Sequence, residues 1–294
     1  MLKFEISKYL AQRHIAGPVL NDALIICKRA SEYGWSNIIS VWGMAKVNPE
    51  ESTAKYIDIL KSIIDDNLDS YLSIKPSSIN FNMHLFELMA CTAAMKNIRI
   101  HFDSLSPDLM DSYISFLKEA FACYGNLGFT LPSRWMRSIK DVDKISRFKI
   151  PVRVVKGQWQ DPDNLKINSK KNFLNIISKL SNEVPLIAVA THDRILAEEA
   201  VNILEKNGSD YELEQFFSLP TIADKICVHH FGLKKRLYVV YGEPYLPYNL
   251  RNANKRPGMI LWILRDVLHM KPYHAFEISN SKTFQNEYHE ITPN

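Results

Sequence analysis

A regular succession of short apolar runs and longer helical patterns is the feature that most restricts the fold of this chain. Each unit of roughly 25–30 residues combines a β-rich run with a segment of helical periodicity, as alternating strand and helix units do. The expected strands are Asn37–Trp42, Ser70–Lys75, Ile98–Asp103, Leu127–Leu131, Pro151–Lys156, Pro185–Ala190, Tyr211–Gln215 and Leu237–Tyr241. The expected helices are Asn48–Asp66, Asn82–Lys96, Pro107–Tyr124, Trp135–Ser146, Leu165–Leu180, Arg194–Lys206, Thr221–His230 and Tyr248–Leu268. Eight such units favour an α/β fold of the closed (β/α)8, TIM-like barrel type.

One further helix completes the expected architecture. It spans Val19–Tyr33 ahead of the first strand, and the Tyr248–Leu268 helix of the eighth unit lies over the barrel mouth. We expect one domain over residues 1–294, with an N-terminal helical segment at 1–35 and a flexible tail at 277–294. A doubly wound sheet is the alternative, but no GxGxxG motif follows the first strand.

Composition and charge argue against a nucleic-acid-binding protein and an integral membrane protein. The 294 residues are 46% hydrophobic and carry a formal net charge of +4, which is too mild to indicate a nucleic-acid partner. The N-terminus lacks the apolar core of a signal peptide, and no apolar run reaches membrane-spanning length, so we expect a cytoplasmic protein without an integral membrane segment. The cysteines form no CxxC pair and predict reduced core thiols: Cys27, Cys91, Cys123 and Cys227.

Chemistry in a (β/α)8 barrel takes place at the C-terminal ends of the strands, so only side chains there are candidates. Five cations meet this condition, against few acids. They are Lys75, Arg134, Arg153, Lys156 and Arg251. Burying so much unpaired positive charge is costly, so either an anionic ligand or internal salt bridges with Asp103, Asp193 and Glu214 must compensate it. The sequence leaves both alternatives open.

The segment Arg236–Gly258 carries the clearest small-molecule signal. A strand is ended by Gly242 and Pro244, and Tyr248 and Arg251 then follow three residues apart on one helical face. A guanidinium and a phenol at this position suit a small carboxylate. Other motifs are weaker, because His229–His230 lacks a third metal ligand and His192–Asp193 lacks a nucleophile elbow.

Over almost the whole chain, these residues resemble the proline dehydrogenase family of FAD-dependent (β/α)8-barrel enzymes. The resemblance runs from AGPVLNDAL (Ala16–Leu24) to RPG (Arg256–Gly258). Its best segments are SIKPSSI (Ser73–Ile79), VRVVKGQWQD (Val152–Asp161), AVATHD (Ala188–Asp193) and YGEPYLPYNLRNANKRP (Tyr241–Pro257).

The resemblance implies that FAD lies across the barrel mouth and that a small amino acid binds beside it. It implies that Arg153, Lys156, Thr191 and His192 contact the cofactor. Substrate contacts would come from Lys75, His101, Trp159, Tyr248, Arg251 and Asn252, with Lys75, Tyr248 and Arg251 closest to catalysis. Hydride transfer from the carbon beside the amine would give an imine of the 1-pyrroline-5-carboxylate type.

The departures from the family pattern fall within the expected site. Asn252 and Lys255 replace an arginine and a glutamate of the last helix, and Pro132 replaces a glutamine after strand four. A family acid on strand three is His101 here, beside Asp103. The EFQ-type block of strand seven reads Glu212–Leu213–Glu214.

Three functions follow as hypotheses. The first is an FAD-dependent dehydrogenase of L-proline or a related cyclic or secondary amino acid, passing electrons to an acceptor such as a quinone, with transient contact to the inner membrane surface. The second, motivated by Pro132 and Asn252, is a non-catalytic relative that binds another ligand or a partner. The third is a biosynthetic flavoenzyme that acts on a modified proline.

Overall fold

A closed barrel of eight parallel strands forms the centre of the computed structural model, which describes residues 15–44, 47–104, 106–219, 221–230 and 232–243. The last strand pairs with the first over seven residues, from Ser36↔Arg236 to Trp42↔Gly242, and this pairing closes the sheet. The strands are β1 (Ser36–Trp42), β2 (Ser70–Ile74), β3 (Ile100–Phe102), β4 (Leu127–Pro132), β5 (Val152–Val155), β6 (Ile187–Ala190), β7 (Tyr211–Phe216) and β8 (Lys234–Gly242). The (β/α)8 prediction is confirmed, and the doubly wound alternative is excluded.

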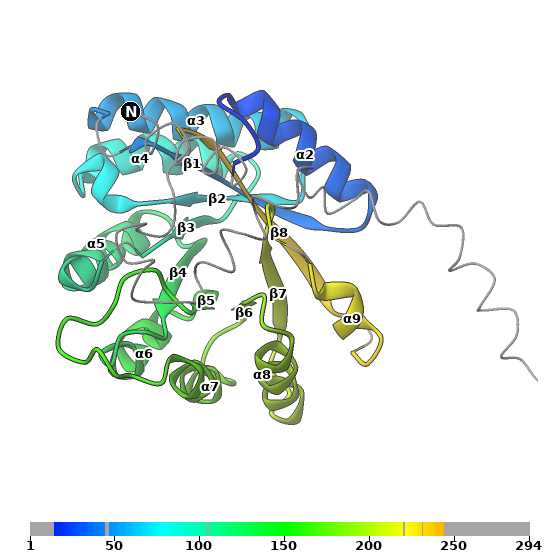
Figure 1. Ribbon diagram of the computed structural model, residues 1–294. Coiled ribbons are helices and arrows are strands. Elements are labelled where there is room, and N and C mark those ends of the chain that lie inside the picture. The colour runs from blue at the N-terminus through cyan, green and yellow to red at the C-terminus, as the bar shows by residue number, and fades with distance from the viewer. Residues whose placement is uncertain (1–14, 45–46, 105, 220, 231, 244–294) are drawn as a thin grey trace, which may run out of the picture.

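Helices α3 to α8 surround the barrel, as Figure 1 shows. The helices are α2 (Leu20–Glu32), α3 (Pro49–Asp65), α4 (Met83–Ala94), α5 (Met110–Cys123), α6 (Ser138–Ile145), α7 (Ser169–Leu180), α8 (Arg194–Lys206) and α9 (Ala223–Cys227). Short 3₁₀ turns are η2 (Pro76–Ile79), η3 (Pro107–Leu109) and η4 (Ser146–Phe148). None of these helices is long and apolar enough to span a membrane, within the ranges that the structure describes.

Helices α6 and α7 begin later than the predicted Trp135 and Leu165, for local reasons. Helix α6 starts at Ser138 because Trp135 is buried in the preceding turn, where its Nε1 donates a hydrogen bond to the Trp159 carbonyl oxygen at 3.0 Å. Helix α7 starts at Ser169 because the side chain of Asn168 caps it, accepting from the Lys171 amide at 3.1 Å. The expected Tyr248–Leu268 helix lies outside the described residues.

Apolar packing lies mainly between the strands and the helices. On α3, Tyr56, Ile59, Leu60 and Ile63 recur at helical spacing and are all buried. Phe102 of β3 stacks on Phe116 of α5, with 5.6 Å between ring centroids. The outward residues of the strands therefore supply the hydrophobic core, and the inward residues are left for other chemistry.

The cysteine prediction is only partly correct. Cys27 on α2 is fully buried, whereas Cys91 on α4 and Cys123 on α5 are exposed and Cys227 is half-buried. The two exposed thiols lie on the solvent sides of their helices, so calling them core residues was wrong. All four are free thiols, as the sequence predicts.

Removing the N-terminal cap of α3 gives a local test of this fold. The Asn48 side chain accepts a hydrogen bond from the Glu51 amide at 2.7 Å. We expect Asn48→Ala to lower the free energy of unfolding by about 1 kcal/mol, as cap removal does. Urea unfolding would measure the loss, and Asn48→Asp, which keeps a capping oxygen, should preserve stability.

Candidate functional site

Among the residues that the structure describes, one guanidinium, that of Arg153, occupies the upper interior of the barrel. Arg153 of β5 is 2% exposed, and the strand register places it between Thr130 of β4 and Ala188 of β6. Its Nε lies 2.6 Å from Glu214 Oε2, and its Nη2 donates to the Tyr71 hydroxyl at 3.0 Å. Its Nη1 lies 3.6 Å from Asp103 Oδ1. Groups from three other strand regions thus hold this one cation.

Glu214 of β7 is the closest carboxylate to Arg153. Tyr71 donates a hydrogen bond to Oε1, while Oε2 lies against the guanidinium, so each oxygen has a partner suited to the ionised form. Burial raises the pKa of Glu214 above its ordinary value; Arg153 opposes this shift and Glu212 adds to it. For Arg153, burial acts to lower the pKa, but Glu214, Tyr71 and Asp103 outweigh it and raise the pKa well above the ordinary value.

A second layer of charge lies below, toward the N-terminal ends of the strands. Glu212 Oε2 accepts from Arg236 Nε at 2.8 Å, and Glu212 Oε1 lies 3.7 Å from Arg99 Nη2. Both guanidinium carbons lie near the ring of Tyr71, at 5.0 Å for Arg236 and 4.0 Å for Arg99. Tyr71 therefore connects the lower layer with the Arg153–Glu214 pair above.

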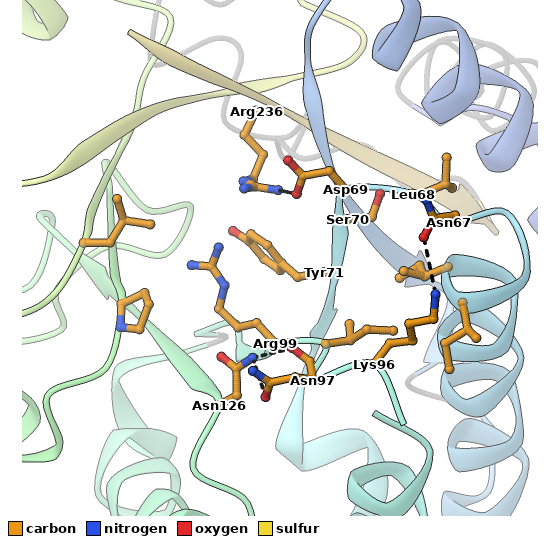
Figure 2. Close-up of a pocket in the computed structure, with 15 residues that line it drawn as sticks. Asn67, Leu68, Asp69, Ser70, Tyr71, Lys96, Asn97, Arg99, Asn126 and Arg236 are labelled. Carbon is orange, nitrogen blue, oxygen red and sulfur yellow. Dashed lines mark hydrogen bonds and ion pairs between the residues drawn. The ribbon is translucent and has the colours of Figure 1, made fainter. Parts of the chain in front are cut away.

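A cavity of about 430 Å³ lies at this lower end. Figure 2 shows Arg236, Tyr71 and Arg99 among the residues that line it. It opens at the N-terminal ends of the strands. In barrels of this kind the residues at that face contribute to stability, whereas active sites lie at the opposite face. Its guanidiniums already have carboxylate partners, because Arg236 also lies 3.6 Å from Asp69 Oδ1. We therefore place the candidate site at the other end, around Arg153.

Lys75 marks the rim at the end of β2. Its side chain is partly exposed, and within the described ranges its Nζ has no hydrogen-bond or ion-pair partner. Burial lowers the pKa of Lys75, the nearby Asp103 raises it, and Arg153 lowers it further. Asp103 in turn accepts from the Tyr238 hydroxyl at 3.2 Å. Lys75 thus has donors to offer an anion.

His101 lies inside the barrel rather than at its rim. It is 1% exposed, and its Nε2 lies 2.9 Å from Thr130 Oγ1, a hydroxyl that Arg153 also approaches. Gly128 makes room for it, because a Cβ there would lie 2.3 Å from His101 Nδ1. Burial lowers its pKa well below the ordinary value, and Arg153, Arg99 and Arg236 add to this. His101 is therefore a neutral interior group.

The loops after β4 and β5 pack on each other beside the mouth. The Arg134 amide donates to the Lys156 carbonyl oxygen at 3.1 Å, and Arg134 Nη1 donates to the Gln158 carbonyl oxygen at 3.2 Å. Gly157 has φ +85°, and a Cβ there would lie 2.7 Å from Pro132 Cβ, so only glycine permits this approach. Lys156 is exposed, and so is half of Trp159.

Thr191 and His192 follow β6 and have local roles. Thr191 Oγ1 accepts from the Asp193 amide at 3.1 Å, and His192 Nε2 accepts from the Phe216 amide at 2.8 Å. A neutral His192 then carries its proton on Nδ1. Asp193 caps α8 and pairs with Lys170 at 2.5 Å, so it does not compensate the mouth cations.

The sequence left open whether internal salt bridges or an anionic ligand compensates the cations at the barrel mouth, and the answer differs between Arg153 and Lys75. Internal salt bridges do compensate Arg153, through Glu214 and Asp103, but they do not satisfy the Nζ of Lys75. Tyr248, Arg251 and Asn252 lie outside the described residues, so their predicted contacts stay predictions.

Sequence reasoning missed several interior groups. Tyr71, Arg236 and Tyr238 face inward, and Tyr238 belongs to a stacked row of rings with Phe216 and Trp42. The signal was present, because Glu212/Glu214 and Arg236/Tyr238 recur with the two-residue period of a strand. Branched apolar side chains usually fill the interior of such barrels, and the polar residues at alternate positions here depart from that pattern.

Curated relatives resemble this chain along most of its length. Proline dehydrogenase 1 of Bacillus subtilis subsp. natto is 22% identical over 275 residues, which cover 88% of this chain and 90% of the relative. Proline dehydrogenase 2 of Bacillus subtilis (strain 168) shows the same identity and coverage. No protein-family model matches the chain.

Solved structures support the fold. Proline utilization A (PutA) from Bdellovibrio bacteriovorus, inactivated by N-propargylglycine, superimposes with a TM-score of 0.68 at 16% identity and covers 88% of this chain. PutA from Bradyrhizobium japonicum gives a TM-score of 0.60 at 15% identity and covers 85%. The chain spans only 32% and 30% of these two longer proteins.

Proposed function

We propose that this chain, a divergent member of the proline dehydrogenase family, oxidises L-proline or a related cyclic or secondary amino acid to an imine with FAD as cofactor. The observation that carries the proposal is the Arg153–Lys75 mouth: one buried, positioned guanidinium and one ammonium with unused donors, both at the C-terminal ends of strands. Such a mouth suits an anionic cofactor together with a carboxylate substrate.

The residues at the mouth fit FAD in chemical type. Lys156 and Arg134 are cations on the loops that border it, which suits a diphosphate, and Arg153 supplies positive charge for a flavin ring. We assign cofactor contacts to Arg153, Lys156, Thr191 and His192. When bound, FAD supplies the chemistry of hydride acceptance from the carbon beside the amine.

The chain's own part is binding and orientation. We assign the substrate carboxylate to Lys75, whose Nζ has donors to spare, together with Tyr248 and Arg251. Trp159 and Asn252 would complete the substrate pocket, whereas buried His101 would act only from below. Fixing the carboxylate sets the direction of the reacting carbon, and orientation of this kind contributes much of the rate in enzymes.

A ligand-binding relative without activity is the second candidate. Pro132 favours it, because this residue ends β4 beside the mouth and has no side-chain donor. A biosynthetic enzyme for a modified proline is a variant of the first candidate, and a strong preference for unmodified proline would exclude it.

We place the protein in the cytoplasm, in keeping with its four free thiols. Its electron acceptor would be a quinone or another oxidant. The protein would reach a quinone by transient contact with the inner membrane surface.

The visible spectrum of the purified protein tests the cofactor assignment. We expect flavin absorbance that stays with the protein through gel filtration, either as isolated or after incubation with FAD. A colourless protein that retains no flavin after incubation would contradict the enzyme proposal and favour the second candidate, whereas proline-dependent dye reduction would exclude that candidate.

A further inference from the structure

We propose that Glu214 is a positioning residue of this site, which holds the Arg153 guanidinium at the barrel mouth and sets how much of its positive charge reaches a bound flavin. The proposal rests on the proposed function for the flavin. The pairing of Glu214 with Arg153 can be tested without it.

The geometry assigns this role to Glu214 rather than to Asp103. Glu214 is 2% exposed and lies 2.6 Å from Arg153 Nε, whereas the Asp103 side chain is 21% exposed and lies 3.6 Å from Nη1. A charge pair is stronger when it is closer and better shielded from water. Glu214 therefore dominates the compensation of Arg153.

Tyr71 fixes the orientation of the Arg153 guanidinium. Its hydroxyl accepts from Arg153 Nη2 at 3.0 Å and donates to Glu214 Oε1, so the three groups form a closed triangle across β2, β5 and β7. The guanidinium cannot rotate without breaking at least one of these contacts. Side chains held in this way keep a charge at a fixed place in a site.

His101 of β3 and Glu214 of β7 are two positions at which this chain departs from what its resemblance to the proline dehydrogenase family implies, namely an acid on strand three and a glutamine in the strand-seven block. His101 reaches Thr130, and Thr130 Oγ1 lies 3.5 Å from Arg153 Nη1, so both positions border the same guanidinium. An aspartate at position 101 would therefore place a second carboxylate on the β3 side of this guanidinium.

The consequence is electrostatic. A reduced flavin gains negative charge, so positive charge nearby stabilises it and a compensating carboxylate weakens that effect. Removing the charge of Glu214 leaves Asp103 as the only carboxylate paired with Arg153 among the described residues. The midpoint potential of the flavin should then become more positive.

Several charged and titratable groups face Glu214, and any pH effect must be assigned against them. They are Arg153 of β5, Tyr71 of β2, Glu212 of β7 and Arg236 of β8. Asp103 and Tyr238 lie against Arg153, and Arg99 lies against Glu212 and Tyr71. Glu212 is the natural comparison, because it is equally buried on the same strand and pairs with Arg236 and Arg99 instead of Arg153.

The test compares four variants with the unmodified protein: Glu214→Gln, Glu214→Asp, Glu212→Gln and the double variant His101→Asp/Glu214→Gln. Spectroelectrochemical titration of the flavin measures the potential of each. We expect a positive shift in Glu214→Gln, a smaller shift in Glu212→Gln, and a return toward the original value in the double variant. Glu214→Asp keeps the charge and should stay close to the original potential, which provides a test if the glutamine variant fails to fold.

Two results would overturn the proposal. One is a Glu214→Gln shift no larger than that of Glu212→Gln. The other is a Glu214→Asp potential that departs from the original as far as the glutamine variant does, because a general packing effect would then explain both.

Unfolding without FAD separates this proposal from the proposed function. Because burial raises the pKa of folded Glu214 above its unfolded value, its contribution to stability is present at low pH and declines as pH rises above the ordinary glutamate range. The unfolding temperature of Glu214→Gln should therefore increase, relative to that of the unmodified protein, as pH rises. A difference that does not change with pH would contradict the raised pKa of Glu214, whereas absence of FAD binding in the unmodified protein would overturn only the proposed function.

Discussion

Replacing Arg153 with methionine is expected to lower the free energy of unfolding by about 3–5 kcal/mol and to abolish retention of FAD. Methionine keeps much of the volume, but the change leaves Glu214 buried without its cation, and breaking one side of a buried pair is costly for that reason. Urea unfolding measures the stability, and the flavin absorbance that remains after gel filtration measures cofactor retention.

A double variant separates the ion pair from packing. In Arg153→Met/Glu214→Gln the stranded charge is gone, so we expect much of the stability to return, as when both members of a buried pair are replaced. Arg194→Met is a matched control, because Arg194 is 53% exposed and pairs with Glu198 at 3.6 Å on the surface of α8. Its effect should stay within about 0.5 kcal/mol. A loss in Arg153→Met as small as in the control would contradict the account.

Replacing Lys75 with methionine is expected to lower kcat/KM for proline by roughly tenfold to a hundredfold. This follows from losing a charge-assisted hydrogen bond to the substrate carboxylate, worth about 1.5–3 kcal/mol. Steady-state dye reduction measures the change. Lys96→Met is the control, because Lys96 lies on the wall of the cavity at the opposite end of the barrel. Equal activity of the two variants would remove Lys75 from the site.

The pH dependence of this step has a definite sign. Burial lowers the pKa of Lys75, so its ammonium loses charge at a lower pH than an exposed lysine does. We expect kcat/KM for proline to fall as pH rises through that lowered pKa. Lys75→Arg keeps its charge to much higher pH, so the alkaline fall should move upward in that variant. If the fall of kcat/KM at high pH stays at the same pH in Lys75→Arg, another group than Lys75 causes it.

The architecture was predictable because each unit carries its own local signals. Asn48 and Asp193 sit where caps are needed, and α8 begins and ends at the predicted residues, Arg194 and Lys206. Boundaries were wrong where tertiary contacts override periodicity. Trp135 has a helical pattern around it, yet its indole is used to fix the loop before α6.

The site was predictable only in part, because contacts across a barrel join residues far apart in the chain. Arg153 was identified from its strand, and Glu214 was one of the acids considered for compensation. The choice of Glu214 over Asp193 depends on the register of β6 and β7, which no local pattern encodes. Tyr71 was missed for the same reason, since its partners Arg153 and Glu214 come from the far side of the barrel.

Anaerobic mixing of the FAD-loaded protein with L-proline tests the central claim most directly. The account predicts that the visible flavin absorbance bleaches in a single turnover and that an imine forms in equal amount. A flavin that stays oxidised with proline and with a panel of related cyclic and secondary amino acids would contradict it.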